Sequence, residues 1–152
     1  MTSAPRQDGL FEPNLFLQFF LAGQPIRRLI EQAIEDSGLS AGEYAVFSAI
    51  EELEPVTPAD VARVVGAPRP TLTAQFEHLI RLGLVRRQPH RSDKRSYTLR
   101  LTARGRRVKL DAGQALLAAT RALDAELGGE SEQTTAMLGR LRAAAEAALG
   151  RG

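Results

Sequence analysis

The fold of this chain is decided by residues 57–102, which read TPADVARVVGAPRPTLTAQFEHLIRLGLVRRQPHRSDKRSYTLRLT. The stretch opens with a strong helix start. The Thr57 hydroxyl can cap free N–H groups, Pro58 suits a first helical turn, and Asp60 places a carboxylate near the positive helix end. This helix is short, because the Gly-Ala-Pro sequence at residues 66–68 closes it.

The second helix, which Pro70 opens, has two faces of different chemistry. Apolar residues recur along it at spacings of four, three and three, and they predict one buried stripe: Leu72, Phe76, Leu79 and Leu82. The other face is expected to stay free and carries side chains that are small or can form hydrogen bonds: Thr71, Thr73, Ala74, Gln75 and His78, with Arg69 just ahead of them.

A basic hairpin follows the second helix. After Gly83, residues 84–88 and 96–101 show the composition and alternation of two strands, and residues 90–95 form the turn between them. Helix, turn, helix and hairpin in this order are a winged helix-turn-helix pattern. We therefore expect a mainly α fold with a small β-hairpin wing, flanked by helical regions from both termini.

The segment before this domain is helical as well. Residues 11–21 place Phe and Leu on nearly every side of a helix, and Gly23 and Pro25 are expected to interrupt it before a second helical segment begins. Ser40 and Glu43 then form a capping box that starts a further helix. Its buried face is expected to include Tyr44, Phe47, Ile50 and Leu53.

After the hairpin, Thr102 can cap a long helix whose apolar residues recur at coiled-coil-like spacing. Glycines at 128 and 129 break it, and a last helix is expected over about residues 130–149. These helices cannot easily bury their apolar stripes within one subunit, which favours dimerisation. The alternative is that they pack on each other in a monomeric bundle.

Composition excludes several classes of function. The chain has no cysteine, which removes disulfides, thiolate metal sites and cysteine redox sensing. Its two histidines, His78 and His90, do not suggest a metal site, and we expect no cofactor. No apolar run is long enough for a bilayer and no signal region opens the chain, so we expect no membrane association and a cytoplasmic location.

Charge is segregated along the chain. Residues 63–109 hold thirteen Lys or Arg against two acids, a local charge of +11 within a net charge of +2. A basic block on a helix-turn-helix indicates a phosphate-binding face. We therefore expect a flexible arm at residues 1–12, a DNA-binding domain at residues 39–102, and a helical dimerisation region at residues 13–38 and 103–150.

Two motifs carry a resemblance to a known family. Residues 79–87 fit the form LxxxGLVxR, and residues 93–102 fit DxRxxxLxLT at the right separation. Together they resemble the MarR family of bacterial transcription regulators. The resemblance implies a homodimer with one winged-helix domain per subunit. It also implies that Arg95 enters the minor groove or grips its phosphates, that Asp93 orients Arg95, and that Leu99 and Leu101 are structural.

The free face of the second helix is the expected reader of base edges, because the major groove presents a distinct pattern for each base pair. The wing cations are expected to bind phosphates and to position the protein. The complete predicted set is Arg69, Pro70, Thr71, Thr73, Ala74, Gln75, His78, Arg86, Arg91, Asp93, Lys94 and Arg95. Any one helix residue could instead be merely solvent-exposed. Two identical readers imply a palindromic operator in double-stranded DNA, with half-sites roughly 34 Å apart.

The family resemblance also implies release of DNA by a small aromatic acid or phenol. The candidate lining residues for such an effector are Phe16, Phe20, Arg27, Tyr44 and Phe47. Aromatic residues at helical spacing more often form a core, and that interpretation is favoured over a ligand site.

The expected function is a dimeric, sequence-specific regulator of transcription, a repressor of neighbouring genes. The alternative is a winged-helix protein-interaction module whose hairpin pairs with another chain. An enzyme is not expected, since the sequence shows no Ser/His/Asp arrangement, metal cluster, glycine-rich phosphate loop or paired buried carboxylates.

Overall fold

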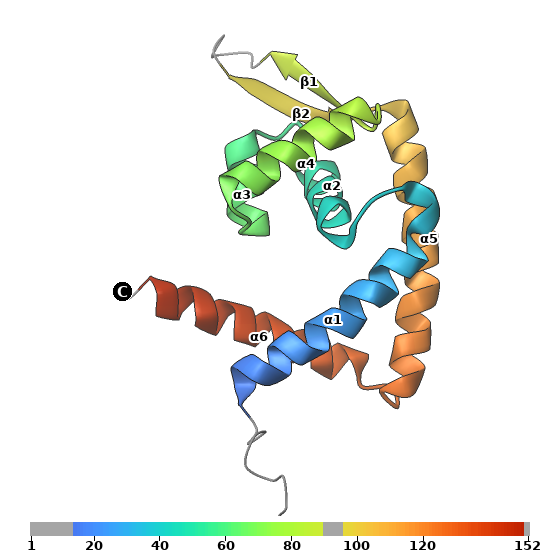
Figure 1. The fold of residues 1–152 in the computed structure, drawn as a ribbon, viewed down its shortest axis with the longest axis vertical. Helices are drawn as coiled ribbons and strands as arrows, with labels where there is room; N and C mark the ends of the chain where they lie inside the picture. The colour runs from blue at the N-terminus through green and yellow to red at the C-terminus, as the bar shows by residue number, and fades with distance from the viewer. Residues whose placement is uncertain (1–13, 90–95, 151–152) are drawn as a thin grey trace, which may run out of the picture.

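The computed structural model describes residues 14–89 and 96–150. Within these residues the chain forms six α-helices, one 3-10 turn and one antiparallel hairpin (Figure 1). In chain order the elements are α1 (Leu15–Ala33), η1 (Glu35–Ser37), α2 (Ala41–Leu53), α3 (Pro58–Val65), α4 (Arg69–Arg81), β1 (Val85–Pro89), β2 (Tyr97–Leu101), α5 (Ala103–Glu126) and α6 (Ser131–Leu149). The mainly α fold with a hairpin wing is confirmed.

One hydrophobic core lies between α2, α3, α4 and the hairpin. The stripe expected on α4 supplies part of it, because Leu72, Phe76 and Leu79 are all buried. Phe47 from α2 and Leu99 from β2 are fully buried against them. Each such side chain contributes about 1.5–3 kcal/mol by leaving water, so this core fixes the position of α4 relative to α2 and the hairpin.

The hairpin is held to the helices at its base. Val85 pairs with Leu101, and both side chains are buried on the core face. Val56, just before α3, forms an isolated bridge with Leu99, with N–H to O distances of 2.8 and 3.3 Å. The strand β2 is therefore paired on both edges, with β1 on one side and with Val56 on the other, and the wing extends from this fixed end of the hairpin.

The helix starts expected from local sequence are confirmed. Ser40 and Glu43 form the capping box of α2, and the Thr57 hydroxyl accepts the Asp60 N–H at 3.2 Å at the start of α3. Thr102 caps α5 by accepting the Gly105 N–H at 2.9 Å. The break after α5 also falls where the sequence placed it, at Gly128 and Gly129.

Two expectations about the helices before α3 are wrong. First, α1 runs without interruption through Gly23 and Pro25. Leu21, whose carbonyl loses its partner at Pro25, is 46% exposed, so water can satisfy that carbonyl. Second, Leu53 lies on the surface at 40% exposure, because it is the last residue of α2, beyond the part that faces the core.

The terminal helices form a second layer away from the winged module. Figure 1 shows α5 running along one side of the molecule, with α1 packed on it and α6 turning back at its far end. Neither α1 nor α6 has a buried residue. Among the described residues, no helix is both long and apolar enough to cross a membrane.

Candidate nucleic-acid interface

The turn between α3 and α4 is built by local backbone chemistry. Gly66 takes a left-handed conformation with φ of 69°, and its N–H donates to the Ala62 carbonyl at 2.9 Å to end α3. Glycine adopts this conformation without the steric cost that a side chain would add. Pro68 then begins α4 without a side-chain cap, so the first turn of α4 keeps free N–H groups.

The start of α4 presents an exposed polar surface. The exposed residues are Arg69, Pro70, Thr71, Thr73 and Ala74. The Thr73 hydroxyl donates to the Arg69 carbonyl at 3.0 Å, which leaves its methyl group available for an apolar contact. We call these five residues the reading face. They are the part of the predicted set that the structure brings together on one free surface.

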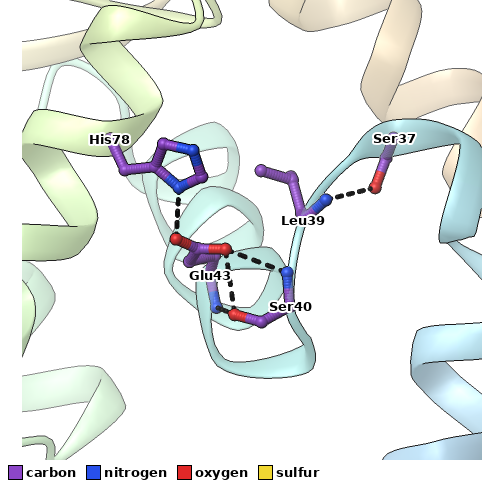
Figure 2. A network of polar contacts seen from close by, with 5 residues as sticks. All are labelled: Ser37, Leu39, Ser40, Glu43 and His78. Atoms are coloured by element: carbon purple, nitrogen blue, oxygen red, sulfur yellow. Dashed lines mark hydrogen bonds and ion pairs between the residues drawn. The ribbon is translucent and has the colours of Figure 1, made fainter.

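Gln75 and His78 do not share that surface. Both are only half-exposed and face the N-terminus of α2, which corrects the expectation that they lie on the free face of α4. The imidazole Nδ1 of His78 pairs with the Glu43 carboxylate (Figure 2). The Gln75 amide lies against Gly42, and its Oε1 is buried without a hydrogen-bond partner among the described residues. Their direction depends on a helix some thirty-five residues earlier, so the local pattern could not reveal it.

The two strands add cations beside α4. Arg86 on β1 lies opposite Arg100 on β2 in the ladder, so two like charges are neighbours. Such a pair repels unless an anion lies close by. Arg87 instead stacks over the Tyr97 ring, with 4.8 Å from guanidinium carbon to ring centroid. Arg86 is therefore available to a phosphate, whereas Arg87 also supports the hairpin.

An open groove of about 670 Å³ separates α4 from β1. Its charged lining comprises Glu77 and Arg81 from α4 and Arg86 and Arg87 from β1. Arg81 was not among the residues predicted from sequence. Arg81 lies in the last turn of α4, just before Gly83 and the hairpin. This position in the sequence could have identified Arg81 as a residue of the groove.

The wing tip lies outside the described residues. Arg91, Asp93, Lys94 and Arg95 belong to this part of the chain, so their roles at the minor groove stay predictions.

The effector residues predicted from sequence do not form one site in this structure. Phe47 is completely buried in the core, and Tyr44 is buried with its ring against the Lys109 ammonium, 4.9 Å from the centroid. Phe16 and Phe20 are 83% and 65% exposed on α1, and Arg27 is exposed on the same helix. The favoured interpretation, that aromatic residues at helical spacing form a core, therefore holds for Tyr44 and Phe47, and an effector site stays a prediction.

A short helix, a tight turn, a second helix with an exposed polar face and a basic hairpin define a winged helix-turn-helix protein. Residues 37–96 match the model of the MarR family. The resemblance read from the two motifs is thus confirmed.

Known proteins are similar to this chain in sequence or in fold. The HTH-type transcriptional repressor YetL of Bacillus subtilis (strain 168) is 27% identical over 95 residues, covering 61% of this chain and 57% of YetL. The match thus spans little more than half the length of that relative. The transcriptional repressor CouR, solved bound to a 23-mer DNA duplex, has a TM-score of 0.81 at 22% identity, covering 93% of this chain and 99% of CouR. A Staphylococcus aureus MarR in complex with salicylate and kanamycin has a TM-score of 0.73 at 20% identity, covering 91% and 92% of the two chains. At these identities the two structures show a shared fold.

Proposed function

We propose that this chain is a dimeric regulator of transcription that binds double-stranded DNA in a sequence-specific manner, with α4 as its recognition helix. The observation that carries the proposal is the reading face, which is polar, exposed and placed beside a basic hairpin. The core holds the opposite side of α4 through Leu72, Phe76 and Leu79, so the helix can enter a groove without unfolding the domain.

The groove between α4 and β1 fits the phosphate backbone. When a helix occupies the major groove and a wing reaches the adjacent minor groove, the strand between them passes between helix and hairpin. Arg81 and Arg86 line this passage, and phosphate contacts of this kind supply most of the sequence-independent affinity. Thr71 and Thr73 can then meet base edges, where threonine offers a hydroxyl and a methyl group.

Dimerisation is supported by the apolar surface that the terminal helices leave uncovered. The large apolar side chains exposed on α1, α5 and α6 are Leu15, Phe16, Phe19, Phe20, Leu21, Ile26, Leu110, Leu117, Leu123, Met137, Leu138 and Leu149. Extended apolar surfaces mark protein interfaces in soluble proteins. A second copy of the chain is the partner we propose, since a twofold pair of readers matches a palindromic operator with half-sites roughly 34 Å apart.

We further propose that the protein represses transcription in the cytoplasm and responds to a small aromatic acid. YetL and CouR are repressors, and the S. aureus MarR was solved with salicylate. Because Tyr44 and Phe47 belong to the core, an effector would bind between α1 and the winged domain of the assembled dimer, without displacing those two rings.

The test is a mobility-shift titration of the full-length protein against the DNA upstream of its own gene and a scrambled duplex of equal length. We expect tighter binding to the upstream DNA and a fall in affinity as salt rises. Equal affinity for both duplexes, or none for either, would refute the proposal. Capture of a protein partner by a chain that binds no DNA would instead support the interaction-module alternative.

A further inference from the structure

A histidine–carboxylate hydrogen bond and an amide contact join the recognition helix to the N-terminus of α2. His78 lies in the second half of α4, and its Nδ1 pairs with Oε1 of Glu43 in the first turn of α2 (Figure 2). Both side chains are largely covered, with exposed fractions of 28% for His78 and 17% for Glu43. A hydrogen-bonded contact to a carboxylate in such surroundings is less screened by water than one on the open surface.

The second oxygen of Glu43 is held by α2 itself. Its Oε2 accepts the backbone N–H and the hydroxyl of Ser40, both at 2.9 Å. Burial opposes ionisation of this carboxyl, but the hydrogen bonds from Ser40 and His78 outweigh burial and lower the pKa of Glu43. The carboxylate is therefore charged at neutral pH and fixed at both oxygens, so it can define a position for His78.

Gln75 makes a second contact on the same side of α4. It precedes His78 by three residues, and its Nε2 lies 3.0 Å from the place that a Cβ on Gly42 would occupy. Residues three apart in a helix are neighbours on its surface. Two adjacent residues of α2 thus face two neighbouring residues of α4, an arrangement that fixes the rotation of α4 about its own axis.

Rotation of α4 matters because the reading face is carried by that helix. A rotation of about 20° moves each Cα by about 0.8 Å, given a helix radius near 2.3 Å. Recognition geometry tolerates errors of only about 0.5 Å. A small loss of rotational restraint would therefore misplace Thr71 and Thr73 together relative to the bases.

We propose that Glu43 is a positioning residue for DNA recognition: through His78 it fixes the rotation of α4 and thereby determines which bases the reading face selects. His78 acts in this interaction and not as a direct reader of bases. This inference rests on the proposed function and adds to it a determinant of specificity that lies on α2, outside the recognition helix.

The experiment uses the full-length chain and a pool of random duplexes. The wild-type protein first selects its preferred sequence, and the affinity of each variant is then measured for that duplex, for its single-base variants and for unrelated DNA. For Glu43→Gln we expect roughly tenfold less discrimination across several adjacent base pairs, the size of one lost base contact. Affinity for unrelated DNA stays unchanged, because the phosphate-binding arginines are not altered.

Thr57→Ala is the matched control. It weakens the N-terminus of another helix, α3, where the Thr57 hydroxyl is the N-cap and accepts the Asp60 N–H, at a distance from Gln75 and His78. This variant should lose stability and keep its discrimination. A merely structural role of Glu43 predicts the same behaviour for both variants and would overturn the inference.

His78→Gln alters the same hydrogen bond from the side of α4, and it provides the test if Glu43→Gln does not fold. If His78 acts through Glu43, each single variant and the double variant lose discrimination between bases to the same extent, and this loss is spread over several base pairs. Additive losses, or a loss confined to one base pair, would assign His78 a direct base contact and overturn the inference. Failure of the wild-type protein to select any sequence would refute the proposed function instead.

Discussion

Gly105 is the position at which one added methyl group should damage the fold most. It lies in the first turn of α5 and is buried. A Cβ placed on it would lie 2.1 Å from the Leu84 carbonyl oxygen, 3.0 Å from the Leu84 carbonyl carbon and 3.3 Å from its Cα. These are backbone atoms, so no side-chain rotation can relieve the overlap. Either α5 or the connection into β1 must move.

The expected cost of Gly105→Ala follows from what this movement breaks. The Leu84 carbonyl accepts the Thr102 N–H at 2.9 Å, a bond worth about 0.5–1.5 kcal/mol. Overpacking a tight site adds about 1–3 kcal/mol. Together they predict a loss of about 3 kcal/mol, a large fraction of a typical total of about 5–15 kcal/mol.

Urea denaturation followed by far-ultraviolet circular dichroism measures this loss. Gly139→Ala is the control, because nothing lies within 4 Å of its Cβ position and the residue sits inside α6. There alanine should stabilise the protein by about 0.5–1 kcal/mol through helix propensity. If Gly105→Ala were as stable as the wild-type protein, the close approach of α5 to Leu84 would be wrong.

Three further predictions address the interfaces and the ionisation of Glu43. Phe16→Glu with Phe20→Glu should convert a dimer to a monomer in analytical ultracentrifugation, because both exposed rings would become charged; an unchanged mass would place the interface elsewhere. Arg86→Ala should weaken binding to all DNA sequences and reduce the salt slope by about 1, whereas Thr71→Val should change the preferred base, in fluorescence-anisotropy titrations. Because the pKa of Glu43 is lowered by folding, its contribution to stability is present above the ordinary value of 4.5 and is lost as pH falls through the lower folded value. Wild-type and Glu43→Gln proteins should therefore converge in stability at acid pH in thermal melts, and a constant difference would contradict this.

Local rules explain what the sequence predicted correctly. The caps at Ser40, Thr57 and Thr102 depend on contacts within three residues, and the stripe on α4 depends on helical periodicity alone. Helix caps and helical periodicity are both determined by residues that lie close together in the sequence. The winged helix-turn-helix order could therefore be derived before any tertiary contact was known.

The errors all concern properties set by distant parts of the chain. Gln75 and His78 are polar residues on a helix, and only the position of α2 decides that they point inward. The helix α1 continues through Pro25 because this region is exposed to solvent. Hydrophobic periodicity does not reveal that exposure.

The position of α2 explains how the two layers of the molecule can act together. Its first turn holds α4 through Glu43, while further along the same helix Glu51 pairs with Lys109 of α5 at 3.1 Å. At its end Glu54 pairs with Arg106 of α5 at 2.5 Å and accepts the Leu101 N–H at 2.7 Å. Because two ion pairs join α2 to α5 and a hydrogen bond joins its N-terminus to α4, a rotation of α5 would either break those ion pairs or displace α2 and, with it, the recognition helix. In the proposed dimer, we therefore expect the packing of α5 against the partner subunit to affect the distance between the two reading faces, and we expect a ligand that changes this packing to change the half-site spacing.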